Sequence, residues 1–268
     1  MSTDVQTVLT IILIQNIAMP HNLLLQEIVV RLNSKIWFLA GAVALLPAQA
    51  LAVKDVSSPY VDAGEIEIES KTGYDIDDDN DVDGTFEQAF EVGYGVTDWL
   101  GVEAGIEFKD EPGEDIETEK LELEATIQLT EKDEFFVDTG LKFGYGHSTN
   151  GGDDELETEL LLAKSYGKFY HGANIEVGTA IGDDVDERGE WGLGWKSKYK
   201  YLETFSPGFE YHASFGDGTD DYEDQEHLLG PVAYGDINEN FEYEAGVLLG
   251  ISEAAPDANL KFILEYKF

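Results

Sequence analysis

Carboxylates recur at alternate positions along much of this sequence, and they are the side chains with which any chemistry would begin. Glu65 and Glu67, like Glu122 and Glu124, are separated by one residue, so each pair would lie on one face of an extended strand. Rings of carboxylates favour cations at close range. The pattern therefore indicates an acidic surface that attracts cations. It does not indicate a paired-carboxylate hydrolase, because alternation alone produces such pairs.

Other catalytic signatures are missing from the sequence. The five histidines have no clustered spacing: His21, His147, His171, His212 and His227. No Gly-x-Ser-x-Gly elbow, Walker loop or dinucleotide fingerprint occurs. With no cysteine, a thiolate metal site, a Cys nucleophile and a disulfide are also excluded. We expect neither an enzyme nor a resident cofactor.

One acidic run has partial calcium-loop spacing. Asp79, Asp81, Asp83 and Gly84 match the first half of an EF-hand loop, in which oxygens at alternate positions converge on the ion. The twelfth position is Phe90 instead of a bidentate Glu. We therefore predict a solvated external loop, with weak divalent-cation binding at the three aspartates as the sharper hypothesis.

The overall charge limits the classes of partner. The chain has 268 residues, with 16 basic and 56 acidic side chains and a formal net charge of −40. Such a charge repels nucleic acid, so nucleic-acid binding is excluded.

The first fifty residues have the order of a secretory signal. Arg31 and Lys35 precede an apolar run over residues 36–46, and Ala50 and Ala52 then supply small residues at a cleavage site. The rival interpretation is a transmembrane anchor. Pro47 and Gln49 interrupt it, and a spanning helix needs about 20 apolar residues.

Cleavage after Ala52 would make Val53 the first mature residue, and cleavage after Ala50 is the alternative. We therefore divide the chain into residues 1–52, a signal peptide with an over-extended start, and residues 53–268, the mature domain. The start is extended because thirty residues precede the basic region.

The mature chain alternates apolar and polar residues with period two, which is typical of strands. About twelve strands are predicted, at residues 64–73, 85–96, 99–109, 116–129, 134–147, 155–166, 169–181, 189–201, 208–216, 225–235, 240–251 and 258–268. Short turns between them alternate with longer acidic, Gly-rich loops, and aromatic residues gather near strand ends. These features favour an all-β, transmembrane, antiparallel up-and-down β-barrel over a soluble sandwich, with both termini on the periplasmic side.

In such a barrel the polar face of each strand lines the lumen. The candidate lumen residues are Glu87, Glu91, Glu103, Glu107, Glu122, Glu124, Lys142, Glu157, Glu159, Glu176, Lys196, Lys198, Glu210, Glu242, Glu244 and Lys261. The last strand carries apolar residues at alternate positions and ends in an aromatic one: Phe262, Leu264, Tyr266 and Phe268. It resembles the carboxy-terminal recognition strand of bacterial outer-membrane proteins, which implies the barrel-assembly machinery as a partner.

Several short stretches extend that resemblance. Residues 92–99 (VGYGVTDW), 162–167 (LAKSYG) with 173–174 (AN), 229–231 (LGP) and 246–268 are similar to the outer-membrane channel family associated with the meta pathway of phenol degradation. The resemblance covers most of residues 85–268. It implies transport across the outer membrane, without implying that phenol is the cargo.

We therefore expect a passive outer-membrane channel or transporter for small solutes, with a preference for cations. The alternative is a non-conducting structural or surface-binding barrel, in which Glu and Lys pair across the lumen and acidic external loops bind divalent cations. Lipid and lipopolysaccharide are the expected surroundings in the bacterial outer membrane.

Overall fold

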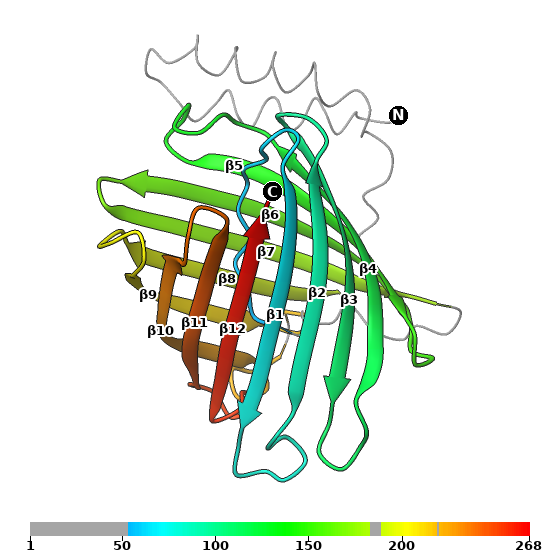
Figure 1. Ribbon diagram of the computed structural model, residues 1–268. Helices are drawn as coiled ribbons and strands as arrows, with labels where there is room; N and C mark the ends of the chain where they lie inside the picture. The colour runs from blue at the N-terminus through cyan, green and yellow to red at the C-terminus, as the bar shows by residue number, and fades with distance from the viewer. Residues whose placement is uncertain (1–52, 183–188, 219) are drawn as a thin grey trace, which may run out of the picture. The chain divides into compact units, whose positions relative to one another are not determined.

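The protein folds as a closed ring of twelve antiparallel strands (Figure 1). The computed structural model describes residues 53–182, 189–218 and 220–268. The strands are β1 (Ile66–Ile76), β2 (Phe86–Gly95), β3 (Leu100–Asp110), β4 (Glu117–Gln128), β5 (Asp138–Ser148), β6 (Asp154–Tyr166), β7 (Phe169–Ile181), β8 (Glu190–Tyr199), β9 (Ser206–Ser214), β10 (Glu226–Asp236), β11 (Phe241–Gly250) and β12 (Ala258–Lys267). The predicted fold class is confirmed. The proposed signal peptide, residues 1–52, lies outside the described residues.

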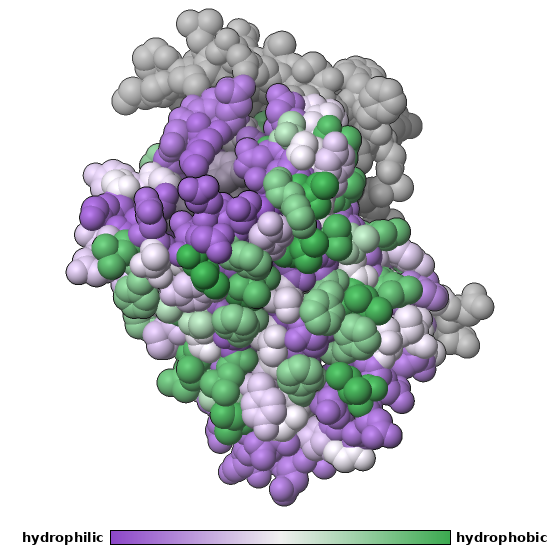
Figure 2. All heavy atoms as spheres, viewed as in Figure 1, coloured by the Kyte–Doolittle hydropathy of each residue, from purple (hydrophilic) through white to green (hydrophobic). Residues whose placement is uncertain are grey.

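The barrel turns its apolar side chains outward. On β4, Leu121 and Leu123 expose 43% and 61% of their surface, whereas Glu122 between them exposes 8%. In a soluble sandwich the apolar face would be buried and the acidic face exposed. The opposite arrangement here identifies a membrane barrel and excludes the soluble sandwich, which alternation alone could not exclude. Figure 2 shows the result as a band of hydrophobic side chains across the middle of one face, with hydrophilic ones toward both ends.

The first and last strands close the ring. β1 pairs with β12 from Glu67 opposite Lys267 to Ile76 opposite Ala258, and Phe268 N–H donates to the Ile66 carbonyl oxygen at 2.9 Å. Closure leaves no unpaired strand edge, and a membrane-spanning sheet requires this because lipid offers the backbone no hydrogen bonds. No helix among the described residues is long and apolar enough to cross a membrane.

The two ends of the barrel differ in their connections. One end, here the short-turn end, carries the connections that follow β2, β4, β6, β8 and β10, and it also holds Phe268. The other, the long-loop end, carries those that follow β1, β3, β5, β7, β9 and β11.

Most strand boundaries fall within three residues of the prediction, and the start of β5 is the exception. It begins at Asp138 instead of residue 134, because side chains hold a wider turn before it. Asp133 has a positive φ of 61° and its N–H donates to Asp138 Oδ1 at 2.9 Å. The Thr139 N–H donates to Thr130 Oγ1 at 2.8 Å.

The residues before β1 run inside the barrel, which the sequence did not indicate. Residues 53–62, the inner segment, appear in Figure 1 as the blue trace within the ring of strands. Val53 and Val56 expose only 5% and 1% of their surface. Lys54 forms an ion pair with Glu226 at the long-loop end of β10, and Asp62 lies beside Gly95 at the short-turn end of β2. The inner segment therefore follows the lumen along much of its length.

Candidate functional site: the barrel interior

All sixteen predicted lumen residues lie on the interior face of their strands. None of them is exposed, and they alternate with outward apolar side chains such as Phe90 and Val92 on β2. Eight are buried: Glu91, Glu107, Glu122, Lys142, Glu159, Lys196, Glu210 and Lys261. The other eight are half-buried: Glu87, Glu103, Glu124, Glu157, Glu176, Lys198, Glu242 and Glu244.

Ion pairs cross the interior between strands that are not neighbours in the sheet. Lys261 on β12 contacts Glu210 on β9 at 2.8 Å, and Lys196 on β8 contacts Glu244 on β11 at 3.2 Å. Lys261 also contacts Glu244 at 3.3 Å, which joins the two pairs into one network. Such contacts are possible only where side chains meet across the lumen, so this level of the barrel is filled by charged groups.

Glu210 is the centre of that network. Tyr234 donates its hydroxyl to Glu210 Oε1 at 2.7 Å, and His212 Nε2 lies 2.9 Å from Glu210 Oε2. Glu210 and the Lys261 side chain expose none of their surface. A buried carboxylate is tolerated when an opposite charge and hydrogen bonds satisfy its oxygens, as they do here.

Two lysines outside the predicted set hold further carboxylates. Lys71 on β1 lies 2.6 Å from Glu91 and 3.5 Å from Asp55 of the inner segment. Lys120 on β4 lies 2.8 Å from Glu122 and 3.5 Å from Glu107. Both lysines follow the same alternation as their strands, so the period-two pattern could have identified them.

Apolar side chains also point into the barrel, contrary to a uniformly polar interior. Leu228, Val232 and Tyr234 of β10 pack with Leu248 of β11 and with Ala255 of the last loop. Leu228 and Leu248 are fully buried. Alternation places these residues on one face of each strand, but it does not say whether that face is the inner or the outer one. Because the side chains are apolar, the sequence does not indicate that they point inward.

The inner segment is held against one wall by hydrogen bonds. The Tyr60 hydroxyl donates to Asp138 Oδ2 at 2.7 Å, and the Val61 N–H donates to Gln128 Oε1 at 2.8 Å. Both acceptors belong to the β4–β5 side of the barrel. Nothing in the sequence of residues 53–62 signals these contacts, since they depend on closure of the ring.

Wall glycines make room for the inner segment. A Cβ on Gly140 would lie 3.0 Å from Pro59 Cβ, and one on Gly194 would lie 3.2 Å from Val56 Cγ2. A Cβ on Gly95 would overlap the Asp62 carbonyl oxygen. Any larger residue at these places would push the segment toward the barrel axis.

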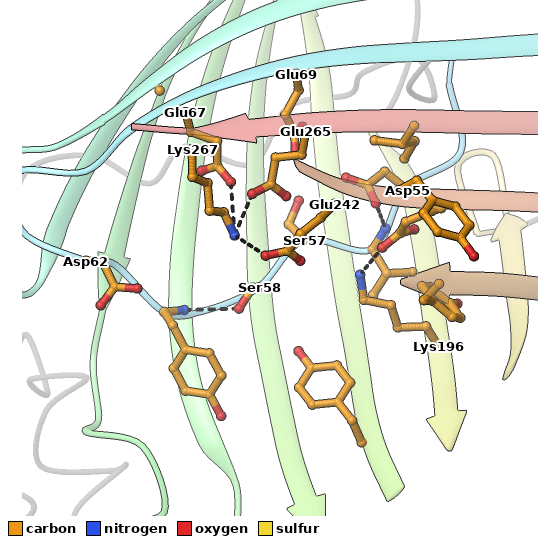
Figure 3. A pocket seen from close by; sticks show the side chains of 18 of the residues that line it. Asp55, Ser57, Ser58, Asp62, Glu67, Glu69, Lys196, Glu242, Glu265 and Lys267 are labelled. Carbon is orange, nitrogen blue, oxygen red and sulfur yellow. Dashed lines mark hydrogen bonds and ion pairs between the residues drawn. The ribbon is translucent and has the colours of Figure 1, made fainter. Parts of the chain in front are cut away.

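A cavity of about 800 Å³ remains on the other side of the inner segment (Figure 3). It reaches the short-turn end, where Tyr201 and Leu202 line it, and it extends inward to Asp55 and Lys196. Eleven carboxylates and seven lysines line it. The cavity is thus a wide, polar vestibule with an excess of negative charge, which we call the large cavity.

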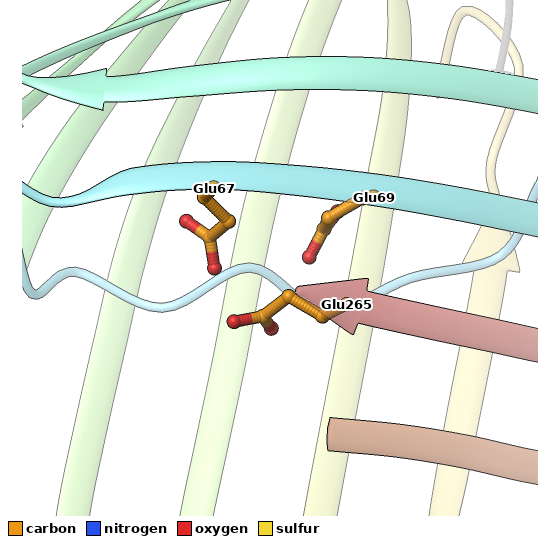
Figure 4. A group of neighbouring side chains, drawn as sticks. All are labelled: Glu67, Glu69 and Glu265. Atoms are coloured by element: carbon orange, nitrogen blue, oxygen red, sulfur yellow. The ribbon is translucent and has the colours of Figure 1, made fainter. Parts of the chain in front are cut away.

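Three carboxylates on the wall of the large cavity come close together: Glu67, Glu69 and Glu265 (Figure 4). The Lys267 ammonium lies 2.5 Å from Glu265 and 3.7 Å from Glu67, and it also contacts Glu242 at 3.1 Å. The third carboxylate, Glu69, pairs with the Lys71 ammonium at 3.1 Å, so each member of the cluster has a lysine partner.

The loop aspartates proposed as weak calcium ligands are not gathered around one point. Within the described residues, Asp79, Asp81 and Asp83 do not form a group with ligand atoms close enough for one ion. Their oxygens serve the loop backbone instead: Asp83 Oδ1 accepts from the Asp77 N–H at 3.1 Å, and Asp79 Oδ1 accepts from the Asp81 N–H at 3.0 Å.

The four residues of the proposed assembly signal lie on the outer face of β12 or directly after it. Phe262 and Phe268 expose 45% and 65% of their surface. The Tyr266 ring packs edge-on against Phe268, with centroids 4.5 Å apart, and against Phe241 at 4.4 Å. Leu264, opposite Ser70 of β1, completes the row.

Solved structures with a similar fold include an outer-membrane channel and a porin. The chain is similar to an outer-membrane channel from Pseudomonas putida F1, with 12% identity and a TM-score of 0.57 over 82% of this chain and 100% of that one. It is also similar to the NanC porin, with 10% identity and a TM-score of 0.54 over 75% of this chain and 98% of that one. At such low identity these likenesses concern the fold. No curated protein sequence matches the chain.

The family model for the outer membrane protein beta-barrel domain matches residues 38–230. This match fits the outward apolar face and the closed ring, and it places the protein in the bacterial outer membrane. The family match also agrees with the expectation that the chain is not an enzyme. On these grounds the chain belongs to the family of outer membrane proteins defined by this beta-barrel domain.

Proposed function

We propose that the protein is a passive channel that carries small solutes across the outer membrane. The large cavity is the observation that carries this proposal: about 800 Å³ of polar space is open to the short-turn end, the periplasmic end in the expected topology. A barrel of about twelve strands is intermediate between filled eight-stranded and open sixteen-stranded forms, so a narrow route fits its size.

We further propose that the route prefers cations. Eleven carboxylates face seven lysines around the large cavity, and an excess of one sign of charge in a narrow, polar passage enriches the opposite ion. The inner segment adds to the excess, because Asp55 and Asp62 line the same cavity.

A non-conducting barrel is the second candidate, and one specific observation favours it. The ion pairs Lys261–Glu210 and Lys196–Glu244 cross the lumen, and they obstruct it where their side chains meet. A non-conducting barrel would act through its surface: its acidic outer loops would bind divalent cations, and these would bridge the loops to the negative charges of lipopolysaccharide.

The cargo is proposed only as a class. The resemblance to channels associated with phenol degradation makes small aromatic compounds the first solutes to compare with sugars and amino acids of similar size. The Tyr170 and Tyr234 rings, which line the large cavity beside Lys198 at 5.3 and 5.1 Å, could contact such solutes.

We propose that residues 1–52 are removed during export. The described chain begins inside the barrel, where Val53 exposes 5% of its surface and Lys54 pairs with Glu226 at 2.7 Å. Cleavage before Val53 leaves a free amino terminus inside. Folding would then depend on the barrel-assembly machinery, which would read the last strand, and the finished barrel would sit among lipid and lipopolysaccharide.

Single-channel recording in planar bilayers tests the function. We expect the wild type to conduct weakly, a variant lacking residues 54–61 to conduct several-fold more, and the reversal potential in a KCl gradient to show preference for K⁺. Conductance with anion preference would overturn the cation proposal. If neither protein conducts although both are folded, the non-conducting barrel is favoured.

A further inference from the structure

A second cavity lies between the inner segment and the opposite wall. It has a volume of about 40 Å³, which is room for one ion or one water molecule. Lys54 and Asp55 contribute from the inner segment, and Glu159, Asn174, Glu176 and Glu226 contribute from β6, β7 and β10. We call it the small cavity.

Carboxylates outnumber cations around the small cavity. Four carboxylates and one ammonium line it. The two nearest lysines are already paired: Lys54 with Glu226 at 2.7 Å, and Lys142 with Glu124 at 3.1 Å. Among the described residues, no ammonium lies within ion-pair distance of Glu176, and its neighbour on that side is another carboxylate, Glu157.

Asn174 supplies an independent observation. Its side chain is 96% buried, since it exposes 4% of its surface, and its amide NH₂ donates to Glu159 Oε2 at 2.7 Å. That bond fixes the orientation of the amide, because an ionised carboxylate only accepts hydrogen bonds. Asn174 Oδ1 then has no hydrogen-bond partner among the described residues, and neither does Glu159 Oε1, which lies 3.5 Å from the Lys142 ammonium. Asn174 Oδ1 is therefore a buried acceptor without a hydrogen bond, on a residue that lines an acidic cavity.

Two wall glycines leave room for oxygens that approach the wall of the small cavity. A Cβ on Gly192 would lie 2.9 Å from Glu176 Oε2, and one on Gly194 would lie 3.4 Å from the Asp55 carbonyl oxygen. The wall is thus thinned at the two places where oxygens of β7 and of the inner segment approach it.

We propose that the small cavity binds a divalent cation of the calcium class, with ligands from Asn174 Oδ1 and the carboxylates of Glu159 and Glu176. Calcium accepts a mixture of carboxylate and neutral carbonyl or amide oxygens in irregular geometry, which matches this set better than the strict octahedron that magnesium requires. Because Asp55 lines the same cavity, the bound ion would fasten the inner segment to the wall.

Calorimetric titration of the full-length folded protein with CaCl₂, after chelator treatment, tests the site. The matched variants are Glu176→Gln, which keeps the shape of the side chain, and Glu265→Gln, a carboxylate of the large cavity. We expect one saturable calcium site in the wild type and in Glu265→Gln, and at least tenfold weaker binding in Glu176→Gln. Asn174→Asp, which adds a charge at the proposed ligand, should bind more tightly.

The acidic outer loops give a background heat that all variants share, so the comparison rests on differences between them. Equal binding in Glu176→Gln and Glu265→Gln would overturn the proposal, because the calcium would then be held elsewhere. Absence of any saturable calcium heat would also overturn it and would leave water as the occupant. Glu176→Gln keeps the shape of the side chain, and heat-modifiability checks that the variant is folded. Asn174→Asp provides a second test, because its calcium affinity should change in the opposite direction.

Discussion

Glu210 exposes none of its surface, and three side chains from three strands satisfy its carboxylate: Lys261, His212 and Tyr234. A charge in such a place is stabilised only as long as its partners remain. Removing one partner leaves the carboxylate buried and uncompensated, whereas removing both charges together costs far less. Single and double substitutions of Lys261 and Glu210 therefore test whether this ion pair stabilises the barrel interior.

We expect Lys261→Met to lower the free energy of unfolding by about 3–5 kcal/mol, because it leaves Glu210 without its ammonium. The double variant Lys261→Met with Glu210→Leu should regain most of that loss. Lys200→Met, at an exposed position near the short-turn end, is the control and should change little. Urea unfolding of the barrel in lipid vesicles measures all three. Equal stability of the single and double variants would contradict the proposed role of the pair.

At the scale of elements, the inner segment and the wall behind it form one packed unit. Gly140 and Gly144 both lie on the inner face of β5, yet they differ in what a Cβ would meet. At Gly140 it would lie 3.0 Å from Pro59 of the inner segment, whereas at Gly144 it would lie 3.4 Å from Glu157 Cβ of the neighbouring strand. The two glycines therefore provide a matched pair.

We expect Gly140→Ala to loosen the inner segment and Gly144→Ala to leave it in place. The measurement is the labelling rate of a cysteine introduced by Ser57→Cys, with a thiol reagent added from the aqueous phase. The rate should rise several-fold with Gly140→Ala, because the segment spends more time away from the wall. If both alanine variants label at the same rate, packing of Pro59 against the wall does not hold the segment.

A contact between two outer loops depends on one carboxylate. Asp77 accepts the Asp79 N–H at 2.7 Å within its own loop and the Asp257 N–H at 3.0 Å from the loop between β11 and β12. These backbone hydrogen bonds lower the pKa of Asp77 below its usual value. Their contribution is complete above the unfolded pKa of about 3.9 and is lost as the pH falls through the lowered folded pKa.

We expect Asp77→Asn to lower the protection factor of the Asp257 amide against hydrogen exchange at neutral pH. The protection factor of the wild type should fall to the same value only in acid, below the usual pKa range of an Asp. Asp81→Asn, in the same loop, is the control. Unchanged protection of the Asp257 amide in Asp77→Asn would show that the two loops are held by other contacts.

The elements also show what the sequence could and could not predict. Alternation placed the strands and their faces, since each residue's side is fixed by the period of the strand. It missed the wide turn before β5, where capping by Asp138 and Thr130 outweighs strand propensity. It also missed the inner segment, because residues 53–62 have no periodicity of their own and gain their contacts only from a closed ring.

At the scale of the whole molecule, closure depends on the seam between β1 and β12. Phe268 extends that seam by one backbone hydrogen bond to Ile66, and its ring packs against Tyr266 on the outer face. The residue is 65% exposed, so its packing contributes little to the finished barrel. An important role for Phe268 would therefore lie in assembly.

We expect deletion of Phe268 to reduce the amount of barrel in the outer membrane and to leave the protein aggregated or degraded in the periplasm. The barrel that does form should unfold at nearly the wild-type temperature, because only an exposed ring and one terminal hydrogen bond are lost. Heat-modifiable mobility of outer-membrane fractions measures the yield. Phe241→Leu is the matched control: it removes another ring that packs on Tyr266 but keeps the terminus. Equal losses in both variants would assign the effect to aromatic packing, and a normal yield without Phe268 would refute the assembly role.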